Sequence, residues 1–199
     1  DPTILDALEA AGYDRDLPSA RRTALSPPPN RYDWRDVVLG NGVTRRPPGL
    51  KIDLGGIAKS WTAWKALDLA EGDCYIDAGG DIALRGSWLV GVEHNGALVT
   101  SLEVEDGGVA TSGIDRRKWV GGHHIIDPRT RRPVVSDVVA ATVVANDAMT
   151  AETVARTIVL LGMWQGLGWA ESVVGVRGAL VTTTRDVTLA IPATKEVLA

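Results

Sequence analysis

The stretch Lys51-Ile52-Asp53-Leu54-Gly55-Gly56-Ile57-Ala58-Lys59 predicts a short strand that ends at two glycines and continues into a helix up to about residue 70. Glycines at such a junction let a ligand approach the backbone closely, and the free N–H groups of the new helix favour an anion. Lys59 lies in the first turn, where the helix dipole disfavours a cation, and a phosphate ligand would explain its place. The alternative is a tight turn that serves only close packing.

Outward from this junction, the sequence predicts more strands than helices, and the strands come in runs. This pattern is typical of an α+β fold with a mainly antiparallel sheet rather than a regular βαβ series. Asp147 is a good helix cap, and Gly162 is a natural stop after the helix that follows it. The predicted strands are residues 37–39, 43–44, 74–76, 82–84, 88–92, 98–104, 123–126, 138–144, 179–183 and 187–191, and the predicted helices are residues 4–11, 57–70, 148–161 and 164–172. Residues 17–30, rich in Pro and Arg, are predicted to form an exposed loop, and residues 185–186 are predicted to be the turn of a closing hairpin.

Composition excludes several classes of protein. The chain has 199 residues, of which 45% are hydrophobic and 23% charged, and this balance is typical of a globular protein rather than a disordered one. A net charge of −4 gives no reason to expect nucleic acid as a partner. The sequence contains no apolar run of the roughly 18–20 residues that a membrane-spanning helix needs.

Two further segments combine glycine with polar side chains. Asp77-Ala78-Gly79-Gly80-Asp81 predicts a turn or bulge between strands, with a metal or ribose contact as the functional alternative. Ala110-Thr111-Ser112-Gly113, followed by two arginines, could cradle a pyrophosphate, and the alternative is a solvated loop after a strand.

Two segments carry titratable side chains. His123-His124-Ile125-Ile126-Asp127-Pro128 predicts one inward-facing histidine, because neighbours on a strand point to opposite faces. That histidine could act as a base oriented by a carboxylate, or it could be structural. In the helix after Asp147, Glu152 and Arg156 lie four residues apart, so we expect them to pair on the helix surface.

Taken together and in this order, these segments resemble one family, the FAD:protein FMN transferases or ApbE family. The matching stretches are Asp1–Thr3, Asp53–Lys59, Asp77–Ile82, Ala110–Gly113, His123–Thr130 and Asp147–Ala151. The resemblance implies a single ApbE-like flavin-nucleotide-binding domain over residues 1–199, T-fold-related, with a mainly antiparallel sheet and flanking helices.

The resemblance also implies an activity. Family members move the FMN half of FAD onto a Ser or Thr hydroxyl of a target flavoprotein, release AMP and need Mg²⁺. Some members instead hydrolyse FAD to FMN and AMP, and a flavin-binding module without transfer activity is the other alternative. The resemblance suggests a location in the cell envelope or outside the cell, with the cytoplasm as the alternative.

Residue roles follow from the same resemblance. It implies that Asp53 and Lys59 contact FAD, that the backbone carbonyl of Gly56 binds metal, and that His124 is the base. Asp127 belongs to the histidine motif and is assigned a catalytic role with it. The position of Thr111, Ser112 and Gly113 suggests that they cradle the nucleotide.

The chain departs from the family pattern in three ways. We expect it to lack the region that precedes Asp-Pro-Thr in family chains and helps to hold the flavin. Ser60 and Arg131 stand where the family has glycine. Glu152 and Arg156 stand where the family has its side-chain metal ligands, Asp and Thr. Glutamate can bind Mg²⁺ but arginine cannot, so we expect Mg²⁺ binding to be weak or lost.

Overall fold

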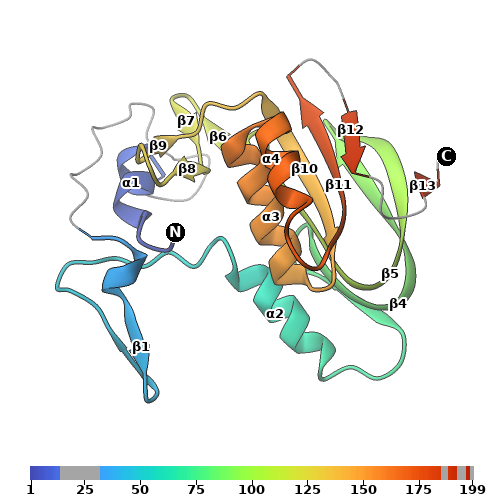
Figure 1. The fold of residues 1–199 in the computed structure, drawn as a ribbon, viewed down its shortest axis with the longest axis horizontal. Coiled ribbons are helices and arrows are strands. Elements are labelled where there is room, and N and C mark those ends of the chain that lie inside the picture. Colours follow the sequence, from blue (N-terminus) through green and yellow to red (C-terminus); the bar gives the residue numbers. More distant parts are fainter. Residues whose placement is uncertain (14–31, 185–187, 192–195, 198–199) are drawn as a thin grey trace. The chain divides into compact units, whose positions relative to one another are not determined.

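The computed structural model describes residues 1–13, 32–184, 188–191 and 196–197. They form two compact units: a first unit of residues 1–54 and 114–135, and a second unit of residues 55–113 and 136–199 (Figure 1). The expectation of one family domain over residues 1–199 stays a prediction. The predicted loop at residues 17–30 and the predicted turn at residues 185–186 lie outside the described residues.

The second unit is built on one antiparallel sheet with the strand order β12-β11-β10-β5-β4-β3, and β13 pairs with β5. The predicted strands 82–84 and 88–92 are one continuous strand, because the backbone passes a bulge between Leu84 and Ser87 with Gly86 at φ +85°. All pairings in this sheet are antiparallel, as expected from the sequence. The strands are β3 Cys74–Asp77, β4 Asp81–His94, β5 Ala97–Gly113, β10 Val138–Ala145, β11 Val176–Thr183, β12 Thr188–Ile191 and β13 Glu196–Val197.

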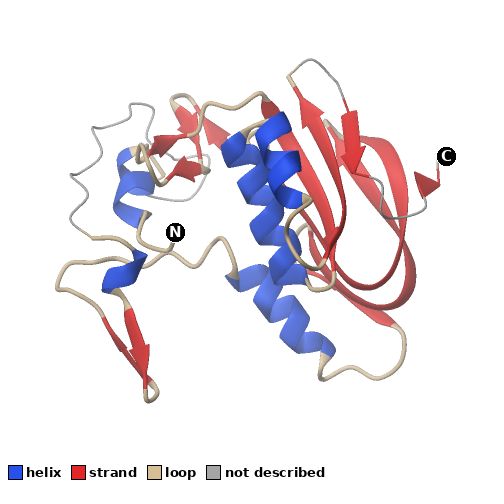
Figure 2. Ribbon diagram, viewed as in Figure 1, coloured by secondary structure: helices blue, strands red, loops and turns tan. Residues whose placement is uncertain are grey.

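Three helices pack on one face of this sheet: α2 Ala58–Leu67, α3 Ala148–Leu161 and α4 Met163–Ala170 (Figure 2). The prediction for α3 is confirmed at both ends. The Asp147 carboxylate accepts hydrogen bonds from the Thr150 N–H and hydroxyl at 2.8 and 2.7 Å, and Gly162 ends the helix at φ +81°. A side chain at Gly108 of β5 would overlap the backbone of Ala148, so this glycine allows α3 to begin directly against the sheet.

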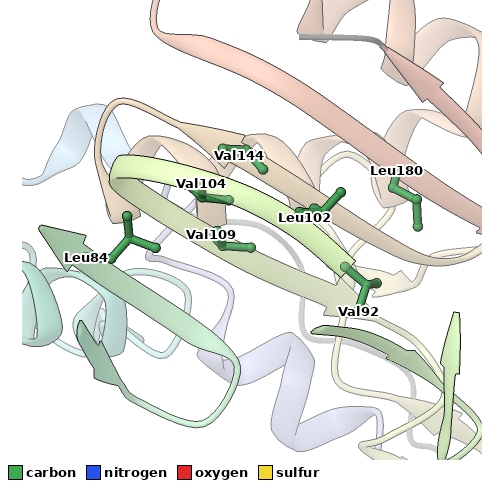
Figure 3. Close-up of a cluster of buried hydrophobic side chains, with 7 residues drawn as sticks. All are labelled: Leu84, Val92, Leu102, Val104, Val109, Val144 and Leu180. Atoms are coloured by element: carbon green, nitrogen blue, oxygen red, sulfur yellow. The ribbon is translucent and has the colours of Figure 1, made fainter. Parts of the chain in front are cut away.

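The opposite face of the sheet carries an apolar cluster of seven buried side chains. The hairpin of β4 and β5 is long and curved, so its far half packs back against its near half and against β10 and β11 (Figure 3). Burying these branched side chains removes apolar surface from water, which is the main favourable term in folding. The cluster consists of Leu84, Val92, Leu102, Val104, Val109, Val144 and Leu180.

The described residues of the first unit form one short helix, a 3₁₀ turn and three small hairpins. The hairpin predicted around Gly40-Asn41-Gly42 is confirmed, with Asn41 at φ +50° and Gly42 at φ +72°. The predicted strand at 123–126 is wrong, because His123 pairs with Lys118 whereas Ile126 pairs with Pro133 in a different hairpin. The elements are α1 Leu5–Ala10, η1 Trp34–Asp36, β1 Val38–Gly40, β2 Val43–Arg45, β6 Lys118–Trp119, β7 Gly122–His123, β8 Ile126–Asp127 and β9 Arg132–Pro133.

The core of the first unit is small. Ala7, Leu8 and Ala11 pack with Ile126, and the rings of Tyr13 and Trp119 stack beside them with centroids 5.6 Å apart. The Trp119 indole N–H donates to the Ala11 carbonyl at 2.9 Å. Among the described residues, none of the helices is both long and apolar enough to cross a membrane.

Candidate functional site

The second unit holds a group of interacting polar side chains between α2, α3 and the start of β4, which we call the buried charge cluster. Its two carboxylates are nearly inaccessible, with side-chain exposures of 2% and 1%, whereas its two cations are 34% and 29% exposed. The acids therefore lie inside and the cations lie toward solvent. The cluster consists of Lys59, Ser60, Asp81, Glu152 and Arg156.

Glu152 is the centre of this cluster, and both of its carboxylate oxygens are bonded. The Ser60 hydroxyl donates to Oε2 at 2.5 Å, and Arg156 Nη2 donates to Oε1 at 3.0 Å. The predicted pairing of Glu152 with Arg156 is confirmed, but its expected place on the helix surface is wrong, because Glu152 is buried. Burial raises the pKa of the Glu152 carboxyl above its ordinary value, and the nearby Asp81 charge adds to the rise against the opposing effects of Ser60 and Arg156.

Lys59 forms an ion pair with Asp81, the first residue of β4. A phosphate ligand is one explanation for a lysine in the first turn of α2. Asp81 supplies a second explanation, because its carboxylate offsets the repulsion between the lysine and the helix dipole. Ile57, the residue just before α2, makes no side-chain hydrogen bond that caps the helix.

The residues present do not fit a Mg²⁺ site at Gly56 and Glu152. A side chain at Gly56 would overlap Arg156 Nη1, so the guanidinium lies directly against the Gly56 backbone. Both oxygens of Glu152 already accept hydrogen bonds. Within the part of the chain that the structure describes, no group of three or more His, Cys, Asp or Glu side chains could hold a metal ion.

Thr111, Ser112 and Gly113 lie in β5 and pair with β10, so the alternative of a solvated loop is wrong. Side chains alternate along a strand, and the two hydroxyls therefore lie on opposite faces of the sheet. The Thr111 hydroxyl is 2.9 Å from that of Thr142, whereas Ser112 is buried on the helix-covered face. A single phosphate group can reach one of these hydroxyls but not both, and nucleotide binding here stays a prediction.

In the first unit, both ring nitrogens of His123 are bonded. Nε2 lies 3.0 Å from the Val134 carbonyl oxygen, and Nδ1 accepts the Ile125 N–H at 3.3 Å. Burial lowers the pKa of His123, so the neutral ring is favoured. His123 therefore has a structural role. The half-buried His124 follows the end of β7, and the choice of His124 as the base stays a prediction.

Asp127, at the end of β8, is held by Arg129. The Asp127 carboxylate accepts four hydrogen bonds from this one residue, one from its backbone N–H at 2.8 Å and three from the guanidinium at 2.9 to 3.2 Å. These hydrogen bonds lower the pKa of Asp127 against the effect of burial. Asp53, also in the first unit, donates its backbone N–H to the Pro2 carbonyl at 2.8 Å.

The structure brings together three predicted site residues of the second unit: Arg156 contacts Gly56 and Glu152, and the Lys59 charge acts on Glu152. It adds Ser60 and Asp81, which the predicted site lacked. Asp81 carried a signal, since it follows two glycines at the start of a strand. For Ser60, the only signal in the sequence was that the family has glycine at this position.

Comparisons with known proteins agree with this fold. A protein-family model described as the ApbE family matches residues 1–180. The chain is 28% identical over 176 residues to the FAD:protein FMN transferase of Klebsiella pneumoniae, a match that covers 79% of this chain and 55% of that protein. It is 31% identical over 154 residues to the FAD:protein FMN transferase of Vibrio cholerae, covering 68% of this chain and 46% of that one. The chain thus spans about half the length of these curated relatives.

Two solved structures are similar. The ApbE protein of Thermotoga maritima has a TM-score of 0.79 at 26% identity, covering 95% of this chain and 68% of that chain. The flavin transferase ApbE of Vibrio cholerae has a TM-score of 0.77 at 26% identity, covering 96% of this chain and 67% of that chain. The ApbE-like α+β fold expected from the sequence is therefore confirmed.

Proposed function

Because the chain belongs to the ApbE family, we propose that it transfers the FMN half of FAD to a Ser or Thr hydroxyl of a target flavoprotein and releases AMP. The family match over residues 1–180 is the observation that carries this proposal. Similar proteins of the family are named FAD:protein FMN transferase, which supports the same reaction here. Since this chain spans about half of their length, the activity, the FAD substrate and the acceptor protein all belong to the proposal.

In the proposed reaction, the oxygen of the acceptor hydroxyl attacks the phosphorus of the FMN half. A phosphorus–oxygen bond forms to the acceptor, and the bond from this phosphorus to the bridging oxygen of the pyrophosphate breaks. AMP leaves with that oxygen, and the hydroxyl proton passes to a base. The reaction therefore needs a base near the acceptor and positive charge near the phosphate oxygens.

We assign the base to His124. His123 is held by Val134 and Ile125 through both ring nitrogens, which favours its neighbour for proton transfer. Asp127 belongs to the same motif, and its link to Arg129 suits a positioning residue that keeps the turn after His124 in place. We assign nucleotide contacts to Asp53, to Lys59 and to the strand end at residues 111–113.

The test is incubation of the protein with FAD, with and without an acceptor flavoprotein, followed by measurement of AMP. AMP that appears only with the acceptor, together with covalent flavin on it, is the expected result. AMP without the acceptor would instead identify an FAD hydrolase. FAD that binds but stays intact would identify a flavin-binding module.

Variants test the assigned roles. His124→Ala should abolish AMP release while His123→Ala keeps it, and the reverse would exchange the two assignments. Lys59→Ala should weaken FAD binding, with Lys65→Ala as the matched control, because Lys65 is an exposed lysine on the same helix. Equal FAD affinity in both lysine variants would remove Lys59 from the site.

One observation favours the binding module as a second candidate function. Arg156 bonds Glu152 and lies against Gly56, the two residues proposed to hold a metal ion. A family member that depends on a metal ion at this place would lose turnover but could keep its nucleotide. For the location we propose the cell envelope or the outside of the cell, and fractionation of cells that make the full-length protein tests this.

A further inference from the structure

We infer that Arg156 is a built-in cation that excludes a divalent metal ion from the buried charge cluster and binds a nucleotide phosphate in its place. The exclusion of metal stands on the cluster alone. The phosphate contact rests on the proposed function, and the experiment below separates the two.

The first step is the state of Glu152. A divalent cation needs oxygen ligands and an approach that no other cation blocks. Here Arg156 Nη2 is 3.0 Å from Oε1, and the Ser60 hydroxyl takes Oε2 at 2.5 Å. An incoming ion would have to displace the guanidinium and would meet its charge at close range.

The second step is the space beside Gly56. The position that a Cβ would take at this glycine is filled by Arg156 Nη1, with the central guanidinium carbon 3.0 Å away. The guanidinium therefore lies between the helix α3 carboxylate and the glycine backbone at the start of α2. The lack of a side chain at Gly56 is what makes room for it.

Three residues that differ from the family pattern, Ser60, Glu152 and Arg156, are joined by hydrogen bonds. Ser60 and Glu152 are 92 residues apart in the chain, yet they share a hydrogen bond. Arg156 bonds the other oxygen of the same carboxylate. A glycine at position 60 would supply no hydroxyl, so the serine, the longer acid and the arginine act as one unit.

The two cations of the cluster lie nearer to solvent than their acidic partners. Arg156 and Lys59 are 29% and 34% exposed, whereas their acidic partners are at most 2% exposed. A guanidinium has five N–H donors, and among the described contacts one of them, on Nη2, is used by Glu152. Nη1 lies against Gly56 and makes no hydrogen bond among the described contacts, and arginine forks bind phosphate well.

The experiment has a metal arm that needs no nucleotide. Electron paramagnetic resonance measures Mn²⁺ binding to the full chain. It should show no stoichiometric site in the wild-type protein at micromolar Mn²⁺. The triple variant Ser60→Gly/Glu152→Asp/Arg156→Thr should bind Mn²⁺ at least about tenfold more tightly. Lys65→Thr removes an exposed positive charge from α2 and should leave Mn²⁺ binding unchanged.

The nucleotide arm measures FAD binding by equilibrium dialysis, with EDTA and with Mg²⁺. The wild-type protein should bind FAD equally under both conditions, and Arg156→Thr should lose about tenfold in affinity in EDTA, as expected for a lost charged hydrogen bond. Far-UV circular dichroism and urea unfolding of every variant show whether the protein is folded.

Three results would overturn the inference. Tight Mn²⁺ binding by the wild-type protein, unchanged by the triple substitution, would refute metal exclusion. FAD affinity that falls on chelation in the wild-type protein would refute the phosphate role. If FAD fails to bind under any condition while the triple variant alone gains Mn²⁺, the proposed function and the phosphate role both fail, and metal exclusion is confirmed.

Discussion

Two carboxylates in this protein pair with an arginine, and their pKa values move in opposite directions. Glu152, in the second unit, pairs with Arg156 one helical turn later, and its pKa is raised. Asp127, in the first unit, pairs with Arg129 two residues later in a turn, and its pKa is lowered. Both acids are buried, but burial is the largest cause of the pKa shift only at Glu152.

The two acids also differ in the donors and charges that surround them. Asp127 accepts four hydrogen bonds from Arg129 alone, including one from the backbone, and these outweigh the loss of water. Glu152 receives one hydrogen bond from Arg156 and one from Ser60, and the Asp81 charge works against its ionisation. An arginine partner therefore does not by itself keep a buried carboxyl ionised. Burial, the number of donors and the neighbouring charges together decide it.

The largest expected effect is the loss of the arginine in the buried charge cluster. Arg156→Met should lower the free energy of unfolding by about 2–3 kcal/mol, because Glu152 loses its partner while it stays buried, and partial exposure of Arg156 keeps the loss below that of a fully buried pair. Arg129→Met is the matched control and should cost much less, since Arg129 is 66% exposed. Urea unfolding measures both, and equal losses would show that the two pairs are energetically alike.

A smaller effect is expected in the pH dependence of stability, with opposite signs for the two acids. The lowered pKa of Asp127 means that its stabilisation is complete above the unfolded value near 3.8 and is lost as pH falls through the folded pKa. The raised pKa of Glu152 means that its contribution is complete below the unfolded value near 4.5 and is lost as pH rises through the folded pKa.

Urea unfolding between about pH 3 and pH 7, compared with Asp127→Asn and Glu152→Gln, measures these differences. The wild-type advantage over Asp127→Asn should shrink as pH falls, and the advantage over Glu152→Gln should shrink as pH rises. Slopes of the same sign would contradict the comparison.

The smallest effect concerns the turn that follows Asp127. Arg131 has φ +57°, a left-handed conformation that suits glycine, and the family pattern has glycine at this position. Arg131→Gly should raise the free energy of unfolding by about 0.5 kcal/mol, because relief of the left-handed strain exceeds the greater entropy of glycine in the unfolded chain. The control Arg132→Gly, in β9, should lower it by a similar amount. A loss of stability in both variants would show that the left-handed conformation of Arg131 is not strained.

Local sequence signals predicted much of the fold. The limits of α3 follow from Asp147 and Gly162, and the first hairpin follows from Asn41-Gly42, because caps and left-handed turns depend on a few neighbouring residues. The strand at 123–126 was mispredicted because His123 and Ile126 find different partners, which local alternation does not reveal. The sequence predicts two strands where β4 is continuous, because a bulge at Gly86 resembles a break.

By itself, the sequence determined the family, the class of fold and the helix spacing that pairs Glu152 with Arg156, because each depends on motifs or on neighbours along the chain. Only the tertiary structure decided that Ser60 and Asp81 join that pair and that the carboxylates are inside. The physical reason is that burial, and with it the cost of charge, depends on how α2, α3 and β4 pack. Contacts between residues 60 and 152 leave no local pattern in the chain that carries them.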